Sequence, residues 1–157
     1  MNDNRQALKV YIASSFSLKD KVVAVEKALE TSGYNVLCKW WTGLDYIPWE
    51  RRTLKDYAKD ASVEEFYSHP GCANAFKRDF QGVKDADFLV FVADDAIRKY
   101  NGANIELGIA LGDNKPCFSI GKLENSALYY PVVKCSSIDE LLTKIPSFHA
   151  QTKTEAQ

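Results

Sequence analysis

The sequence is poor in the residues that build metal centres, and it has no long apolar run. It holds two histidines, His69 and His149, and four cysteines, none of them spaced as a CxxC pair. No apolar stretch reaches the roughly 18 residues of a membrane span, and the segment MNDNRQALK lacks the apolar core of a signal peptide. We therefore expect a cytoplasmic protein without metal or membrane contact, whose cysteines are reduced thiols.

Net charge is also nearly absent. The chain has 20 basic and 21 acidic residues, a net charge of −1, so no overall field attracts a nucleic acid polymer. A local cationic pocket for one phosphate stays compatible with this balance. The 157 residues, 46% of them hydrophobic, suit one globular domain.

Apolar runs alternate with helical patterns along the chain. The expected strands are 8–13, 34–39, 87–93, 116–121 and 131–135. The expected helices run from Ser17 to a C-cap at Gly33, through 76–83, over 104–111 and over 139–145, before Pro146. This alternation predicts a Rossmann-like (flavodoxin-like) α/β fold, with a mainly parallel five-stranded sheet and helices on both faces.

Two segments lie outside this alternation. Residues 40–72 form an aromatic insert without clear periodicity, apart from a short helix over 63–67 capped by Ser62 and Glu65. The polar residues 149–157 are expected to be a disordered tail of a single domain, 1–148.

Ligands of doubly wound sheets bind at the carboxyl ends of the strands. The loop after the first strand supplies hydroxyls and a helix N-terminus, which together suit an anion. Its candidate residues are Ser14, Ser15, Phe16, Ser17 and Lys19. Alternatively, Ser17 is only the N-cap of the following helix, and the two roles are compatible. No GxGxxG or Walker sequence is present, so neither dinucleotide nor triphosphate binding is indicated.

Glu106 is expected in the first turn of the helix that begins at Gly102 and Asn104. The positive helix end would hold its carboxylate ionised, and an ionised carboxylate suits nucleophilic attack at an anomeric carbon. From the residues alone, ordinary electrostatic capping is the simpler interpretation.

Asp79 and Tyr11 are two further candidates. Asp79 precedes Phe80 on an apolar helix stripe and would bind sugar hydroxyls or pass a proton to a departing base. Its alternative is a solvated acid paired with Arg78 or Lys77. Tyr11 interrupts an apolar strand, and a carboxylate is a suitable partner for its hydroxyl if the strand is buried; otherwise the hydroxyl reaches solvent.

The aromatic insert and the loop after residue 93 offer weaker candidates. Most of the tryptophans fit a core or an interface, but Trp41, with Asp45, is kept for base recognition. Asp94 is a candidate base-binding group, while Arg98 and Lys99 either meet a phosphate or form a solvated loop.

Three segments together resemble the nucleoside 2-deoxyribosyltransferase-like superfamily, which includes deoxyribosyltransferases and nucleoside 5′-monophosphate N-glycosidases. They are KVYIASSF, RDFQGVKDADFLVFVAD and GANIELGIALGDNKPCF, within residues 9–121. The resemblance implies that Glu106, in a G-x-x-x-E-[LI]-G pattern, attacks C1′ of a nucleoside or nucleotide. It also implies that Tyr11 touches this nucleophile, that Asp79 is a site residue, that no cofactor is needed, and that the chain forms a homodimer or larger homo-oligomer.

The sequence departs from the family in two places. Its polar end does not resemble the tail with which deoxyribosyltransferases reach a neighbouring subunit, and the loop 94–101 matches neither enzyme pattern. Water is the favoured acceptor, because Ser15, Ser17 and Lys19 would receive a 5′-phosphate. Two alternatives stay open: a nucleotide- or NAD-sensing module of TIR type, which binds or hydrolyses its ligand, and a catalytically inactive subunit.

Overall fold

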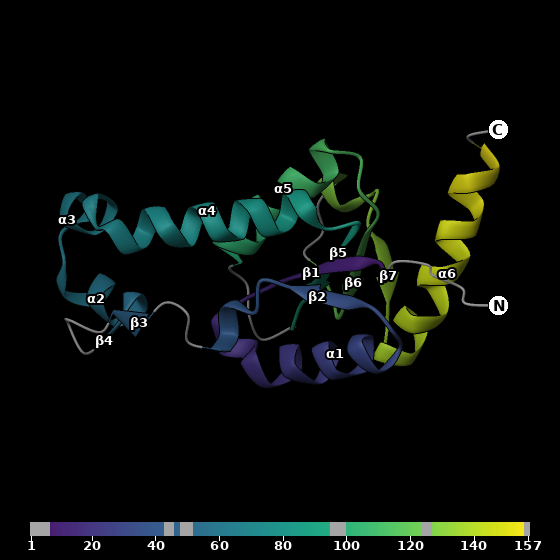
Figure 1. The fold of residues 1–157 in the computed structure, drawn as a ribbon, viewed down its shortest axis with the longest axis horizontal. Helices are drawn as coiled ribbons and strands as arrows, with labels where there is room; N and C mark the ends of the chain where they lie inside the picture. Colours follow the sequence, from purple (N-terminus) through teal and green to yellow (C-terminus); the bar gives the residue numbers. More distant parts are fainter. Residues whose placement is uncertain (1–6, 43–45, 48–51, 95–99, 124–126, 156–157) are drawn as a thin grey trace.

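Five parallel strands form the central sheet of the structure, a computed structural model that describes residues 7–42, 46–47, 52–94, 100–123 and 127–155. The strands are β1 (Lys9–Ser14), β2 (Asn35–Leu37), β5 (Phe88–Val92), β6 (Cys117–Ile120) and β7 (Val133–Cys135). Their order is β2-β1-β5-β6-β7, with every pair parallel (Figure 1). The order reverses between β1 and β5, so the predicted flavodoxin-like fold is confirmed.

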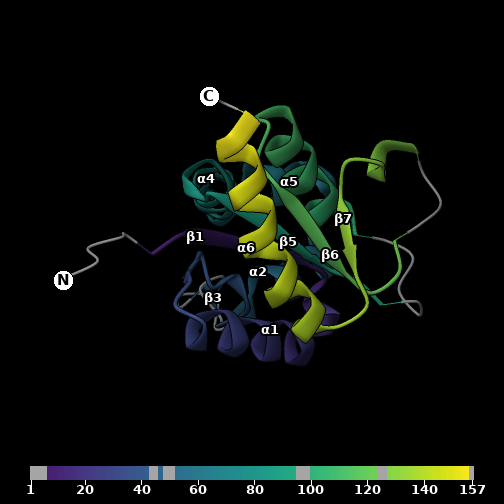
Figure 2. The same ribbon diagram turned by 90° about the vertical axis from the view of Figure 1, so that its right-hand side faces the viewer.

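Helices cover both faces of this sheet (Figures 1 and 2). α4 (Pro70–Asp85) and α5 (Asn101–Gly112) lie together on one face, while α1 (Lys19–Thr31) and α6 (Ile138–Glu155) meet on the other. All five residues of β5 are buried as a result. Burial from both sides explains why this strand reads as a continuous apolar run.

The C-terminal end of α1 is capped as predicted, and its N-terminal end is not. Val22, Val25 and Leu29 form its buried stripe, and Gly33, with φ of 87°, ends it in the left-handed conformation, as predicted. The start differs from the prediction. Ser15, not Ser17, caps a short 3-10 helix, η1 (Phe16–Leu18), and α1 begins behind it without a side-chain cap.

The segment 40–72 is more regular than its sequence indicates. It contains η2 (Trp40–Thr42), the antiparallel pair β3 (Tyr46–Ile47) and β4 (Arg52–Thr53), and the helices α2 (Leu54–Asp60) and α3 (Val63–Ser68). α2 and α3 lie beyond the sheet, beside the start of α4 (Figure 1). The prediction of an irregular insert is therefore wrong. The sequence does not reveal α3 by its periodicity, because this helix buries no side chain and so has no apolar stripe. Its capping box, Ser62 with Glu65, is present as predicted.

The last helix is longer than the sequence predicted. The 3-10 helix η3 (Ala127–Tyr129) precedes β7, and α6 then starts behind the Ser137 cap, whose hydroxyl accepts from the Glu140 amide at 3.1 Å. α6 passes Pro146 and reaches Glu155, so the expected end at 145 and the tail from 149 are corrected. Proline removes one amide donor, and the Ser147 hydroxyl donates to the Thr143 carbonyl one turn back at 3.3 Å. No helix in the described ranges is long and apolar enough to cross a membrane.

Candidate active site

Tyr11 and Glu106 meet between the sheet and α5, although 95 positions separate them along the chain. The Tyr11 hydroxyl donates to Glu106 Oε1 at 2.8 Å, and the Tyr11 side chain is fully buried. Burial and the charge of Glu106 both raise the pKa of Tyr11, so the hydroxyl stays a donor at neutral pH. A buried hydroxyl thus has the carboxylate partner that the sequence suggested.

Gly82 on α4 provides the space that this tyrosine ring occupies. A Cβ at position 82 would lie 2.9 Å from Cys38 Cβ and 3.0 Å from Tyr11 Cε2. Both distances are shorter than an ordinary van der Waals contact, so α4 packs this closely on β1 only because residue 82 has no side chain. The glycine therefore fixes where the Tyr11 ring can lie.

The ionisation of Glu106 differs from the sequence-based expectation. α5 begins at Asn101, and its first turn holds no acid, so Glu106 lies in the second turn, where the helix end acts more weakly. Burial, together with the charge of Asp79, raises the pKa of Glu106 to about 7, against the opposing effects of Tyr11 and Arg78. Near neutral pH the carboxyl group is therefore about half ionised.

One oxygen of Asp79 is held by two neighbours. Asp79 Oδ1 accepts from the Cys38 thiol at 3.1 Å and from Arg78 Nε and Nη2 at 2.8 Å each. Among the described residues, nothing donates a hydrogen bond to Asp79 Oδ2 or to Glu106 Oε2. Each carboxyl group thus has one oxygen fixed by protein donors and a second oxygen left for another group.

Sequence reasoning missed Cys38 and treated Arg78 only as the surface partner of Asp79. Cys38 directly follows β2 and adopts a left-handed φ of 49°, which is uncommon for a residue other than glycine. Burial raises the pKa of its thiol to about 12, so the group is a donor and not a thiolate. Its position at the carboxyl end of the strand next to β1 is the signal that could have identified it.

The loop after β1 uses most of its hydroxyls internally. Ser14 Oγ donates to the Val92 carbonyl at 2.7 Å, and the hydroxyls of Ser15 and Ser17 lie 2.7 Å apart. The Phe16 ring is 43% exposed, and the Lys19 side chain is exposed at the start of α1. Phe16, Ser17 and Lys19 are exposed and Ser15 is half-buried at this edge of the sheet, whereas the Ser14 hydroxyl is bonded to β5.

Trp41 belongs to the core, which corrects its assignment to base recognition. Its side chain is 1% exposed, and its Nε1 donates to Glu26 Oε2 on α1 at 2.9 Å. The ring also packs edge-on against Trp40, at 5.2 Å between centroids. Such a ring offers no open face for stacking. Asp45 lies outside the described residues, as do the loop residues Arg98 and Lys99.

Three other candidates surround the start of α5 and the end of β5. The Asp94 carboxylate pairs with Lys21 of α1, a partner that the sequence did not suggest. Asn104 Oδ1 accepts from the Tyr129 hydroxyl at 2.9 Å. Gly102 is exposed, and a Cβ there would meet no atom within 4 Å, so no contact in the described chain requires a glycine.

A separate cavity of about 720 Å³ opens beside Asp94, at the carboxyl ends of β5, β6 and β7. Neither Glu106, Tyr11 nor Asp79 lines it. The described ranges contain no cluster of three or more histidine, cysteine or acidic side chains that could hold a metal ion.

Comparison with known proteins agrees with the fold. No family model matches the chain, and no curated protein matches it in sequence. A solved 2-deoxyribosyltransferase from Bacillus psychrosaccharolyticus superposes with a TM-score of 0.62 at 20% identity, over 85% of this chain and 90% of that one. A solved CMP N-glycosidase from Clostridium botulinum gives 0.52 at 16% identity, over 88% of this chain and 98% of that one.

These two structures define the class of fold to which the chain is similar. The chain shares the α/β architecture of a deoxyribosyltransferase and of a nucleotide N-glycosidase over most of its length. The likeness supports the resemblance of the sequence to the nucleoside 2-deoxyribosyltransferase-like superfamily at the level of the fold. Activity does not follow from fold alone, and has to be argued from the site.

Proposed function

We propose that the protein cleaves or transfers the N-glycosidic bond of a (deoxy)nucleoside or nucleoside 5′-monophosphate, with Glu106 as the nucleophile. The observation that carries this proposal is the hydrogen bond from buried Tyr11 to Glu106 Oε1, next to Asp79. That bond orients the carboxyl group and leaves Oε2 for a substrate carbon. The likeness to two proteins that act on this type of bond adds support.

The reaction has two steps. In the first, Glu106 Oε2 attacks C1′ and forms a glycosyl ester, while the bond from C1′ to the base breaks and its electron pair leaves with the base. The departing base takes up a proton that comes from solvent, and Asp79 Oδ2 either relays this proton or accepts a hydrogen bond from a sugar hydroxyl. In the second step, water or another base attacks C1′ while the ester bond from C1′ to Glu106 Oε2 breaks; the attacking group gives up a proton to solvent, and Glu106 is released as a carboxylate.

Tyr11 and Arg78 have positioning roles in this scheme. The Tyr11 hydroxyl opposes the rise in the pKa of Glu106 that burial causes, and thereby keeps a larger fraction of the carboxylate ionised. Arg78 holds Asp79 Oδ1, so that Oδ2 stays available. No metal ion or organic cofactor takes part in either step.

We also propose that the protein works as a homo-oligomer in a reducing compartment such as the cytoplasm. Large apolar side chains are exposed on α4, on α5 and near η3, namely Phe76, Ile105, Leu128 and Tyr130 at 63%, 64%, 80% and 88%. Exposed apolar side chains of this size support the proposal of a subunit contact where they lie close enough to form one patch. All four cysteines are free thiols. Analytical ultracentrifugation of wild type and Ile105→Glu tests the assembly: wild type should sediment as a dimer or larger species and the variant as a monomer, and a monomeric wild type would refute it.

The activity is tested by measuring free base released from nucleosides, 5′-monophosphates and NAD, with and without an acceptor base. Glu106→Gln keeps the shape of the side chain and removes its charge, so release should fall by at least about a thousandfold (a loss of roughly 4 kcal/mol of transition-state stabilisation). Glu64→Gln, on the exposed face of α3, is the matched control and should match wild type.

The outcomes separate the alternatives. Release that needs an acceptor base indicates a transferase, and release to water indicates a hydrolase. If wild type and Glu106→Gln are equally inactive while a nucleotide still binds, the enzyme proposal fails in favour of a sensing module.

A further inference from the structure

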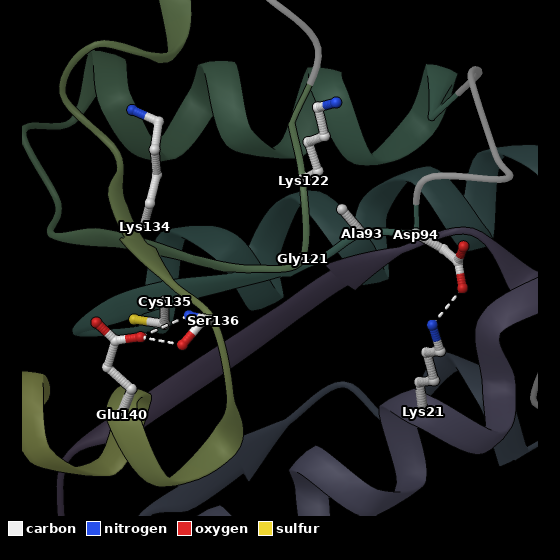
Figure 3. A pocket seen from close by; sticks show the side chains of 9 residues that line it. All are labelled: Lys21, Ala93, Asp94, Gly121, Lys122, Lys134, Cys135, Ser136 and Glu140. Carbon is white, nitrogen blue, oxygen red and sulfur yellow. Dashed lines mark hydrogen bonds and ion pairs between the residues drawn. The ribbon is translucent and has the colours of Figure 1, made fainter.

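The cavity beside Asp94 is a second place where the protein can hold a ligand. Its volume of about 720 Å³ lies within the range of small-molecule sites. It is formed by the ends of three strands together with α1 and α6. Its lining includes Gly121 and the charged residues Lys21, Asp94, Lys122, Lys134 and Glu140 (Figure 3).

The floor of this cavity depends on Gly121. Its φ of 86° lies in the left-handed region, and a Cβ there would collide with the carbonyl oxygen of Ala93. Only glycine lets the segment after β6 turn so close to the end of β5. The hollow is thus built into the backbone.

Both carboxylates of the cavity wall already have partners. Asp94 pairs with Lys21 (Figure 3). Glu140 pairs with Lys144 at 2.7 Å, and it also accepts from the amide and the hydroxyl of Ser136 at 2.6 Å each. These donors lower the pKa of Glu140 to about 2. Neither carboxylate is therefore left to neutralise another cation.

Lys122 and Lys134 are the two cations that remain. Neither has a carboxylate partner among the described residues, and Lys134 Nζ makes only a long hydrogen bond of 3.4 Å to the Tyr129 carbonyl. Figure 3 shows both side chains extending away from Glu140, with their terminal nitrogens turned to opposite sides. Both side chains are exposed, so rotation about their χ angles can bring the two ammonium groups to one anion. Within the described part of the chain, the cavity thus has two lysines whose charge no carboxylate compensates, in a protein whose net charge is −1.

We propose that this cavity binds the phosphate group of a small phosphomonoester, through the ammonium groups of Lys122 and Lys134. A phosphomonoester carries a charge of about −1.5 to −2 at neutral pH, which matches the two cations. The volume leaves space for a sugar-sized body beside the phosphate. This site lies apart from Glu106, and the proposal does not depend on the reaction proposed above.

The test is an amide NMR titration of the ¹⁵N-labelled protein with inorganic phosphate and with ribose 5-phosphate at low ionic strength. The amides of Gly121 and Ser136 should shift saturably, and added salt should weaken binding because both lysines are exposed. The double variant Lys122→Ala/Lys134→Ala should bind at least about tenfold more weakly.

A charge-matched control separates a site from a general charge effect. Lys27→Ala/Lys77→Ala removes two exposed lysines of α1 and α4 and should bind like wild type. The proposal is overturned if wild type shows no saturable shift, or if both double variants lose binding equally. It is also overturned if the shifts gather at Ser15 and Ser17 and Lys122→Ala/Lys134→Ala changes nothing.

Discussion

Replacing Tyr11 by phenylalanine removes the hydroxyl that donates to Glu106 and keeps the ring that packs against Gly82. A hydrogen bond to a charged group contributes roughly 1.5–3 kcal/mol, and a pKa shift of one unit corresponds to about 1.36 kcal/mol. The pKa of Glu106, about 7 in the wild type, should therefore rise to about 8–9. At pH 7 the ionised fraction would then fall from about a half to between about a tenth and a hundredth.

The sign of the effect on activity follows from which form reacts. The nucleophile is the carboxylate, so kcat/KM for base release should rise with pH through the pKa of Glu106 in the free enzyme. At pH 7 Tyr11→Phe should lose about 5- to 50-fold in kcat/KM by this effect. The kcat/KM values of wild type and Tyr11→Phe should converge at high pH, where Glu106 is ionised in both enzymes.

Two measurements check this prediction. The pH profile of kcat/KM reports the active form, and an NMR titration of ¹³C-labelled glutamate side chains reports the pKa of Glu106 without any substrate. Tyr130→Phe, at a side chain 88% exposed, is the control and should change neither. An unshifted Glu106 titration in Tyr11→Phe would refute the reasoning, because it would mean that the hydroxyl does not stabilise the carboxylate.

Three further predictions concern the stability of the protein, the packing around the site and the thiol donor of Cys38. The pKa of Glu106 is 4.5 in the unfolded chain and about 7 in the folded protein, so ionisation of this group lowers the stability of the wild type as pH rises through this window. In urea unfolding, the free energy of unfolding of Glu106→Gln should exceed that of wild type by up to roughly 3 kcal/mol at pH 8 and by little at pH 4. Equal differences at both pH values would contradict the shift. Gly82→Ala should destabilise by about 1–3 kcal/mol through its clash with Tyr11, whereas Gly108→Ala, where a Cβ meets nothing, should stabilise by up to about 1 kcal/mol; similar thermal shifts for both would count against this packing. Cys38→Ala should lower kcat severalfold by removing a thiol donor, and Cys38→Ser should restore most of it; identical kinetics of the two would mean that the donor is irrelevant.

The sheet could be predicted from sequence because its strands are buried on both faces. Segments such as 87–93 are nearly continuous apolar runs, and β5 lies inside that segment. The same argument fails for α3, which buries no side chain. It also fails at the start of α5, where Asn101 and Gly102 carry no periodic apolar signal although they are helical.

The sequence predicts Tyr11, Asp79 and Glu106 as members of the candidate site, but it predicts neither Cys38 nor the electrostatics. The contact between Tyr11 and Glu106 that the family resemblance implied is present in the structure. The raised pKa of Glu106 was not foreseen, because burial by residues distant in sequence decides it. The contact of Cys38 with Asp79 joins residues 41 positions apart, and the burial of Trp41 depends on Glu26 of another helix. Such contacts follow from the tertiary fold and leave no local pattern.

The central claim is the glycosyl ester on Glu106, and mass spectrometry of the quenched enzyme tests it most directly. A nucleoside substrate that carries an electron-withdrawing fluorine at C2′ slows hydrolysis of the ester, so the intermediate should accumulate. We predict that the peptide containing Glu106 gains the mass of the sugar in the wild type, and that Glu106→Gln shows no such gain. Base release at the wild-type rate by Glu106→Gln, with no adduct on Glu106 in the wild type, would contradict the account.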